Sequence, residues 1–364
     1  MSGADRLRLM IPGPIELAPE VLEVMAEPLV AHYGEEWTQF YRETIERLKS
    51  IFRTQERLFL IPGSGSACLD AAIGSTLYPD RRALVVQNGF FGERLAEIAG
   101  SYTPHVTRVN LPAGQPVDIE EIERRIRTGR FDALLVTHCE TAAGILNPIQ
   151  EMGVFCKQHG VLLIVDAISS LAIEPFEMDS WGIDVCVAAS QKGLEAPPGL
   201  GAVAVGRAAW EIVERTNRPG WYLSLKVWQD YETRWHAWHP YPVTHAVANV
   251  RALRVGVDRI LEEGLDDRLL RHERVCRSLR GGLGERGFPP LVADEFAAHG
   301  VTAVTGGGRD ISQLLWNLMT KHGLLLAGGM GDLAGAVFRV GHMGPGANDE
   351  AVEGLLEALD EECT

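Results

Sequence analysis

The segment Leu162-Leu-Ile-Val-Asp-Ala167 is apolar until Asp166 near its carboxyl end, which is the pattern of a strand covered on both faces. Similar short apolar runs alternate with amphipathic segments from about residue 20 to residue 207. In the first amphipathic segment, Glu35–Ile51, the large apolar residues fall on one helical stripe. This alternation predicts an α/β fold, with a large, mostly parallel sheet and helices on both of its faces.

The remaining elements follow from the same periodicities. Further strands are expected at 58–61, 83–87, 105–111, 133–138, 185–190 and 201–206, and further helices at 67–77, 91–100, 118–128 and 149–159. Between residues 208 and 245 the pattern changes, and five of the eight tryptophans crowd together. Around His236, His239 and His245 the prolines favour a packed aromatic loop. A long helix from Thr244 to about Glu263 follows, and then elements at 266–283, 301–305, 310–322, 336–342 and 349–362. We therefore expect an N-terminal arm with the large domain over 1–255 and a small α+β domain over 256–364.

Composition excludes several classes of protein. The 364 residues include 34 Lys and Arg against 49 Asp and Glu, a formal charge of −15, so binding to nucleic acid or to anionic lipid is not expected. No apolar run is long enough to span a membrane, and the N-terminus lacks the apolar core of a signal peptide. The six cysteines show no C-x-x-C spacing, and no Cys or acidic residue completes a metal site with His236, His239 and His245. We expect a cytoplasmic protein without a metal.

Two features lie where ligands bind in open α/β sheets, at the carboxyl ends of strands. Gly63-Ser-Gly-Ser66 follows a strand and opens a helix, so its backbone N–H groups could bind a phosphate. The alternative is a plain turn with Ser66 as the helix N-cap. Asp166 ends its strand with a charge that is costly to bury without a partner. It could hold a cationic ring nitrogen, or it could be an ordinary cap or loop carboxylate.

Two basic residues complete the candidates. Lys192 follows the strand 185–190 directly and precedes the turn Pro197-Pro-Gly199. A lysine held at a sheet edge can lose its proton and form a Schiff base, although a solvated loop lysine is the simpler alternative. Arg339 interrupts the apolar run 336–342, so it either faces solvent or binds a carboxylate.

Together these features resemble a pyridoxal-phosphate enzyme, and the sequence is similar to the class V aminotransferases of fold type I, within the alanine–glyoxylate and serine–glyoxylate group. The matching stretches occur in one order along the chain: Ile11-Pro-Gly-Pro14, Pro62-Gly-Ser-Gly65, Asn88-Gly-Phe-Phe-Gly92, Thr137-His-Cys-Glu-Thr141, Val165-Asp-Ala-Ile-Ser-Ser170, Ser190-Gln-Lys192, Ala196-Pro-Pro-Gly199 and Phe338-Arg-Val-Gly341.

The resemblance implies roles for single residues and a pyridoxal 5'-phosphate cofactor. Lys192 would form the aldimine and move protons, and Asp166 would pair with the pyridine nitrogen. The other implied contacts are the phosphate for Gly65, Ser66 and Gln191, the cofactor ring for Phe91, a place beside the cofactor for Thr141, and the substrate carboxylate for Arg339. Tyr241 or Thr244 would contact the phosphate of the partner subunit in a homodimer.

The implied reaction transfers an amino group from a small amino acid, alanine or serine, to a small 2-oxo acid, glyoxylate or pyruvate. The sequence departs from the animal enzymes at Ser66, where they have His. The segments Trp238–Thr244 and Gly341–Pro345 look more like the pyridoxamine–pyruvate transaminase branch, in which a carboxylate replaces the phosphate cradle when free pyridoxamine is used. A cysteine desulfurase or lyase shares the fold, but usually has His where Gln191 stands. A non-enzymatic subunit that kept the fold is a second rival.

Overall fold

The large sheet of this computed structural model has seven strands in the order β2-β10-β9-β8-β5-β3-β4. The structure describes residues 7–216 and 220–363, so residues 1–6, which entered the localisation argument, lie outside it. The strands are β2 (Arg57–Pro62), β3 (Ala83–Gln87), β4 (Val106–Asn110), β5 (Ala133–Thr137), β8 (Leu162–Asp166), β9 (Val185–Ala189) and β10 (Leu200–Val205).

Only β10 runs against its neighbours, since it pairs antiparallel with both β2 and β9, whereas the other pairs are parallel. The central strands are buried throughout because they consist almost wholly of Val, Leu, Ile and Ala. All parallel strands therefore end at one edge of the sheet, and the residues that follow them meet there.

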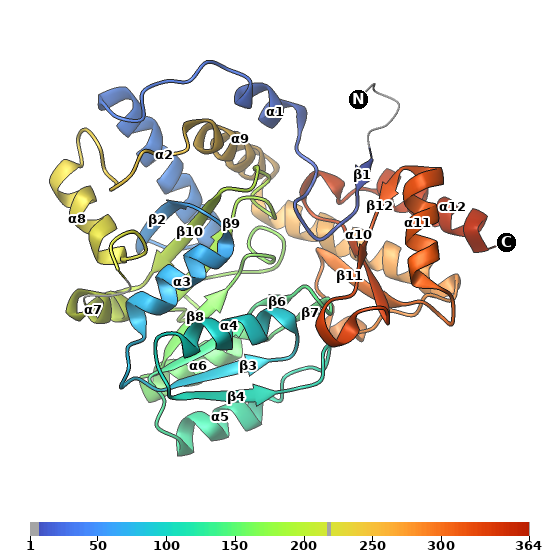
Figure 1. Ribbon diagram of the computed structural model, residues 1–364, viewed down its shortest axis with the longest axis horizontal. Coiled ribbons are helices and arrows are strands. Elements are labelled where there is room, and N and C mark those ends of the chain that lie inside the picture. The colour runs from blue at the N-terminus through green and yellow to red at the C-terminus, as the bar shows by residue number, and fades with distance from the viewer. Residues whose placement is uncertain (1–6, 217–219, 364) are drawn as a thin grey trace.

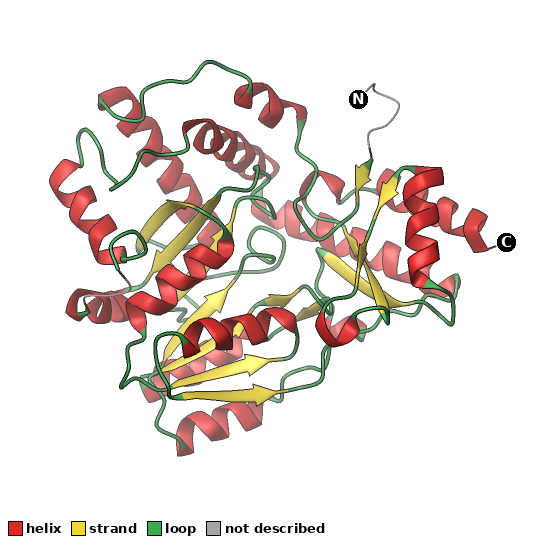
Figure 2. Cartoon of the chain, viewed as in Figure 1, coloured by secondary structure: helices red, strands yellow, loops and turns green. Residues whose placement is uncertain are grey.

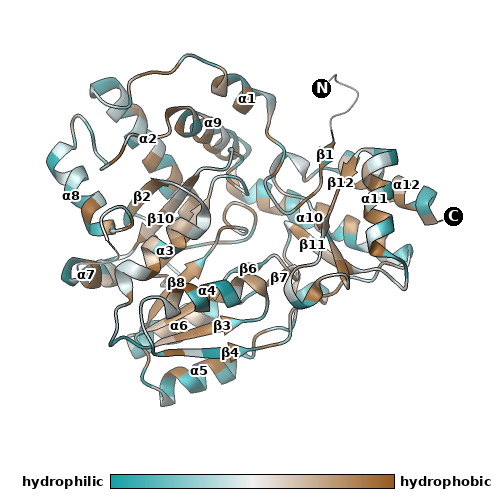
Figure 3. Ribbon diagram, viewed as in Figure 1, coloured by the Kyte–Doolittle hydropathy of each residue, from teal (hydrophilic) through white to brown (hydrophobic). Residues whose placement is uncertain are grey.

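Helices cover both faces of this sheet (Figure 1). They are α2 (Glu35–Phe52), α3 (Gly65–Thr76), α4 (Phe90–Gly100), α5 (Ile119–Thr128) and α6 (Ile149–His159). Of the next three helices, α7 (Arg207–Arg215) and α8 (Leu225–Trp235) pack on α3, and α9 (Val247–Glu263) packs on α2. Helix α3 packs on β9 and β10, and α4 packs on β3 and β5. Figure 3 shows the hydrophobic colour concentrated on the strands and on the inner sides of these helices. The first turns of α3 and α4 lie at the edge where the strands end.

The C-terminal part forms a second, smaller layer around its own core (Figure 2). It contains α10 (Leu265–Glu285), α11 (Ile311–His322), α12 (Asp349–Cys363) and a three-stranded sheet of β11 (Val301–Thr305), β14 (Val337–Gly341) and β13 (Ala327–Gly328). Near the N-terminus, β1 (Arg8–Leu9) pairs with β12 (Leu324–Leu325), whereas α1 (Pro19–Met25) packs on α9. The first described residues thus bridge the two parts.

The structure confirms the predicted α/β class and the mostly parallel sheet. Residues 236–246 form turns and loop, as predicted around His236, His239 and His245, but α7 and α8 in the preceding stretch were not expected. Buried Trp210 and Trp228 anchor these helices, and prolines alone did not distinguish a loop from short helices. Helix α9 begins at Val247, three residues later than expected. The division at residue 255 stays a prediction, with its boundary inside α9.

Two helical glycines give a matched test of the packing. A Cβ on Gly153 in α6 would lie 1.7 Å from the Trp181 carbonyl oxygen, whereas a Cβ on Gly354 in α12 would meet nothing within 4 Å. We predict that Gly153→Ala destabilises the protein by about 1–3 kcal/mol through this clash. Gly354→Ala should stabilise it by about 0.5–1 kcal/mol, because alanine favours the helix. Urea unfolding measures both, and equal effects would contradict this packing.

Candidate active site

The loops that follow β2, β5, β8 and β9 bring the predicted residues to one edge of the sheet. Asp166 is the last residue of β8 and lies opposite Thr137 of β5 in register. Lys192 lies three residues beyond the end of β9. Arg339 lies on β14, in the smaller sheet, opposite Ala303 and Ala327. Arg339 Nη1 donates to the carbonyl of Thr141, four residues after Thr137, so it lies near the strand end that carries Asp166. Lys192 interacts electrostatically with both charges.

The Lys192 amine is covered by the N-terminal segment. Its Nζ donates a hydrogen bond to the carbonyl of Pro12. A Cβ on Gly13, which has φ +120°, would lie 2.6 Å from Cδ and Cε of Lys192. On the same segment, Ile15 N donates to Gln191 O at 3.2 Å. Only glycine leaves room for the lysine side chain under this turn.

The pKa of Lys192 is lowered to about 8, chiefly by burial and also by the Arg339 guanidinium, whereas the Cys139 side chain and the Asp166 carboxylate raise it in part. A substantial fraction of the amine is therefore neutral near physiological pH. A neutral amine is the form that can act as a nucleophile or accept a proton. The lysine is thus neither a solvated loop residue nor a permanently charged one.

Asp166 is almost fully buried, and this burial raises the pKa of its carboxyl group to about 6. The Ile168 N–H, which donates to Oδ1 at 2.9 Å, and the charges of Lys192 and Arg94 lower that pKa in part. Its Oδ2 accepts no hydrogen bond from any residue that the structure describes. The carboxylate is therefore free to accept a hydrogen bond from a protonated ring nitrogen.

The turn after β2 has the form of an anion cradle. Ser64 caps α3, since its Oγ accepts the Ala67 N–H at 3.2 Å, so the alternative with Ser66 as N-cap is wrong. The N–H groups of Gly65 and Ser66 have no acceptor within the described part of the chain. A Cβ on Gly65 would lie 2.5 Å from Ile168 Cδ1, so this turn is packed directly against the segment after Asp166.

Phe91, in the first turn of α4, is half-buried. Its backbone is held by Glu140, a residue that had no expected role. Glu140 is fully buried, and its carboxylate accepts the N–H groups of Phe91, Gly92 and Ala142 at 2.8–3.1 Å. Burial raises the pKa of Glu140 to about 7, and these N–H groups lower it in part. Glu140 lies within one of the motifs but could not be given a function from the sequence, because Phe91 and Gly92 lie 49 and 48 residues away.

Arg339 is 7% exposed, and no described carboxylate lies within ion-pair distance of it. Its Nε donates to Gly328 O at 2.9 Å and its Nη1 to Thr141 O at 3.3 Å. Burial lowers the pKa of Arg339, and the Glu140 charge opposes this effect. A buried guanidinium held by carbonyls, with donors to spare, can bind the carboxylate of a ligand.

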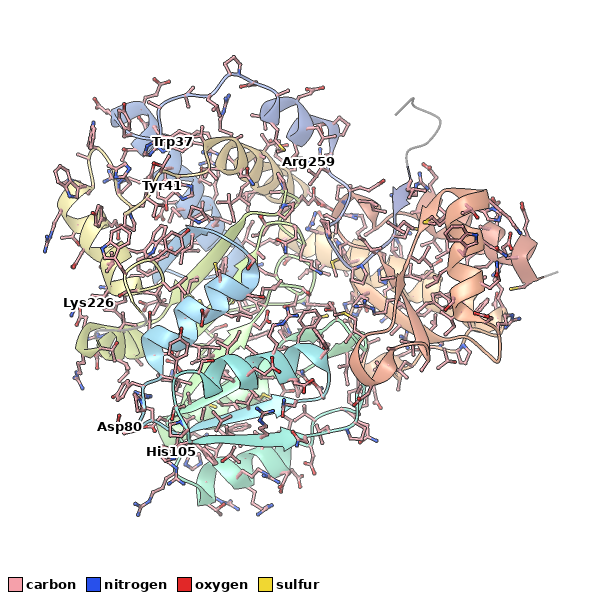
Figure 4. All side chains as sticks on the ribbon, viewed as in Figure 1. Trp37, Tyr41, Asp80, His105, Lys226 and Arg259 are labelled. Carbon is pink, nitrogen blue, oxygen red and sulfur yellow. The ribbon has the colours of Figure 1, made fainter. Side chains whose placement is uncertain are left out.

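The remaining predicted contacts differ in accessibility. Tyr241 is fully buried, and its hydroxyl is used within its own chain, since it accepts from Trp37 Nε1 and donates to His32 O. Figure 4 shows Trp37 with Tyr41 on α2. Thr244 is exposed, so of the two it is the one free to contact a partner subunit. The Gln191 side chain forms no hydrogen bond with a described residue.

A family model described as aminotransferase class-V matches residues 22–331. The chain belongs to the class-V aminotransferases. It is 38% identical to an uncharacterized aminotransferase of Methanocaldococcus jannaschii over 92% of this chain and 87% of that one.

Two solved structures are close to this class-V aminotransferase throughout. An alanine–glyoxylate aminotransferase from Nostoc sp. has a TM-score of 0.93 at 30% identity, covering 98% of this chain and 95% of the other. A pyridoxamine–pyruvate aminotransferase from Mesorhizobium loti has a TM-score of 0.94 at 27% identity, covering 99% and 93%. Fold type I is thereby confirmed. Among the described residues, no helix combines the length and apolar character needed to cross a bilayer.

The lowered pKa of Lys192 gives a prediction that can be tested without a cofactor. In cofactor-free protein, acetylation of Lys192 should rise with pH to half its maximum near pH 8, because only the neutral amine reacts. Asp166→Asn should lower this midpoint, since it removes a charge that stabilises the ammonium form, and Arg339→Gln should raise it. Peptide mass spectrometry reports the labelling, and half-buried Lys226 of α8 (Figure 4), whose Nζ donates to Glu214 O at 3.0 Å, is the internal reference. Midpoints unchanged in both variants would contradict the proposed proximity.

The covering turn gives a second prediction. Gly13→Ala should displace the turn from Lys192 and reduce aminotransferase turnover by at least about 10-fold, because small misplacements of a reacting group are costly. Gly34→Ala is the matched control, since Gly34 has φ +96° but a Cβ there would meet nothing within 4 Å. Similar losses in the two variants would show that backbone strain, and not the contact with Lys192, is responsible.

Proposed function

We propose that this class-V aminotransferase uses pyridoxal 5'-phosphate to transfer the amino group of a small amino acid, alanine in the first place, to glyoxylate. The observation that carries the proposal is the convergence of Lys192, Asp166 and the carboxylate-free Arg339 at the edge where the parallel strands end. A reactive amine, a free carboxylate and a free guanidinium are the three groups that an amino acid and a pyridinium ring require.

The residues fit this cofactor. The phosphate has two unpartnered N–H groups at Gly65 and Ser66, at the positive end of α3. The free oxygen of Asp166 would accept a hydrogen bond from the ring nitrogen, and Phe91 would contact the ring. When bound, pyridoxal phosphate supplies an electron-withdrawing ring that delocalises the electron pair left by Cα–H cleavage. A protonated ring nitrogen is needed for this, and the buried carboxylate of Asp166 stabilises that proton.

The chain's own groups position the substrate and move its proton. The Arg339 guanidinium binds the substrate α-carboxylate, because no described carboxylate competes for it. This would orient the Cα–H bond toward Lys192, whose Nζ would accept the Cα proton and hold it for the return transfer. The pKa of about 8 suits this task, since the amine can both take and give a proton near neutral pH.

Glyoxylate as acceptor is supported by the name of the Nostoc relative, and pyridoxamine–pyruvate transamination is the second candidate, supported by the Mesorhizobium loti structure. The cradle favours the first, because a site for free pyridoxamine has no need for unpartnered N–H groups at Gly65 and Ser66. A cysteine desulfurase is not favoured. Five of the six cysteines are buried, and exposed Cys363 ends α12.

A homodimer in the cytoplasm is part of the proposal. Leu29, Val30, Tyr33 and Trp238 are exposed, and the ring of Tyr33 lies 5.0 Å from that of Trp238, in the segment that leads to Thr244. A second subunit would cover such apolar side chains. Thr244 would then reach the partner's cofactor phosphate. All six cysteines are free, which supports a reducing compartment.

The test follows both half-reactions. Purified protein should change its visible absorption on addition of L-alanine and recover it with glyoxylate, with pyruvate and glycine formed in equal amounts. Lys192→Ala should lower turnover by about 10²–10⁴-fold, the usual contribution of a general base, and Lys226→Ala is the matched control. Full turnover by Lys192→Ala would refute the proposal. If the protein were active with L-serine but not with L-alanine, serine would be the donor. If it were active only with pyridoxamine, pyridoxamine would be the donor.

A further inference from the structure

One arginine near the cradle has no role in the reaction described above. Arg94 lies in α4, one turn after Phe91, and its side chain is half-buried. Its Nη1 lies 3.5 Å from the Oγ of Ser66, the residue that opens the cradle. Its guanidinium also influences the Asp166 carboxylate electrostatically. Arg94 therefore extends from the neighbouring helix to the first turn of the cradle helix α3.

The contacts of Arg94 leave its charge available. No described carboxylate lies within ion-pair distance of the guanidinium. Asp70, which lines the same surface hollow, accepts a hydrogen bond from Tyr102 Oη at 2.7 Å. Instead of a carboxylate, the rings of Phe90 and Phe91 lie 5.0 and 5.1 Å from the guanidinium carbon. Such contacts hold the side chain in place and leave most of its N–H groups unused.

A phosphate bound at this cradle would need a positively charged side chain beside it. Ser66 has no charge, and the helix N-terminus contributes only about half an elementary charge, whereas a phosphate carries up to two. A guanidinium beside the Ser66 hydroxyl can bind two phosphate oxygens at once. The nearby acidic side chains, Asp70 and Glu97, line the outer hollow and would repel an anion that was not held by such a cation.

We propose that Arg94 binds the phosphate group of the cofactor together with Ser66 and the cradle N–H groups, and so selects the phosphorylated cofactor over free pyridoxal. This inference rests on the proposed function. It makes Arg94 a specificity-determining residue and explains how a site with serine at position 66 can hold a dianion.

The experiment compares two aldehydes that differ only in the phosphate. Cofactor-free protein is titrated with pyridoxal phosphate and with pyridoxal, and binding is followed by the absorption of the bound form. For Arg94→Gln we expect pyridoxal phosphate to bind about 10- to 100-fold more weakly, the range of a lost charge-assisted hydrogen bond, and pyridoxal to bind as in the wild type. Arg94→Lys should recover part of the loss. Inorganic phosphate should compete with pyridoxal phosphate less well in Arg94→Gln than in the wild type.

The matched control is Arg108→Gln, which removes an exposed arginine of β4. Unchanged pyridoxal binding shows that each variant is folded. Equal losses of both aldehydes in Arg94→Gln, or no loss of either, would overturn the role of Arg94. Wild-type protein that binds pyridoxal as tightly as pyridoxal phosphate would also overturn it. Wild-type protein that binds neither would instead refute the proposed function itself.

Discussion

The arrangement of the molecule depends on keeping opposite charges close together in a space with little water. Lys192, Asp166, Glu140 and Arg339 come from four separate segments; the last three are buried and Lys192 is half-buried. Alone, any of them would be costly to bury, and together they compensate one another in part. The parallel strands make this possible because they deliver their last residues to one edge. The sheet therefore fixes the site, and the charges in turn require the covering segment Met10–Ile15.

Most of the fold could be predicted from the sequence because its signals are local. The strand 162–166 is apolar until Asp166, and the helix 149–159 has one apolar face, so both were placed to within a residue. Helices α7 and α8 were missed because prolines and tryptophans obscure their periodicity. Asp166 and Lys192 could be found because they interrupt or directly follow buried strands, where a charge needs an explanation.

The remaining parts of the site could not be predicted because they depend on contacts between distant segments. Nothing in the spacing places Pro12 against Lys192, since 180 residues separate them. Glu140 is an ordinary acidic residue until α4 is docked on the sheet and its first N–H groups need an acceptor. Arg94 looks like a solvated helix residue for the same reason. Tyr241 and Thr244 could not be ranked until packing buried one and exposed the other.

The pairing of β1 with β12 has a mechanical consequence. Because Met10 O also accepts the Gly341 N–H at 2.8 Å, the start of the covering segment is attached to the smaller sheet, whereas Lys192 is attached to the large one. The hydrogen bond from Lys192 to Pro12 thus links the loop after the large sheet to a segment that is held by the smaller one. A shift of one sheet relative to the other would change the surroundings of the amine. The pKa of Lys192 would then report the relative position of the two sheets.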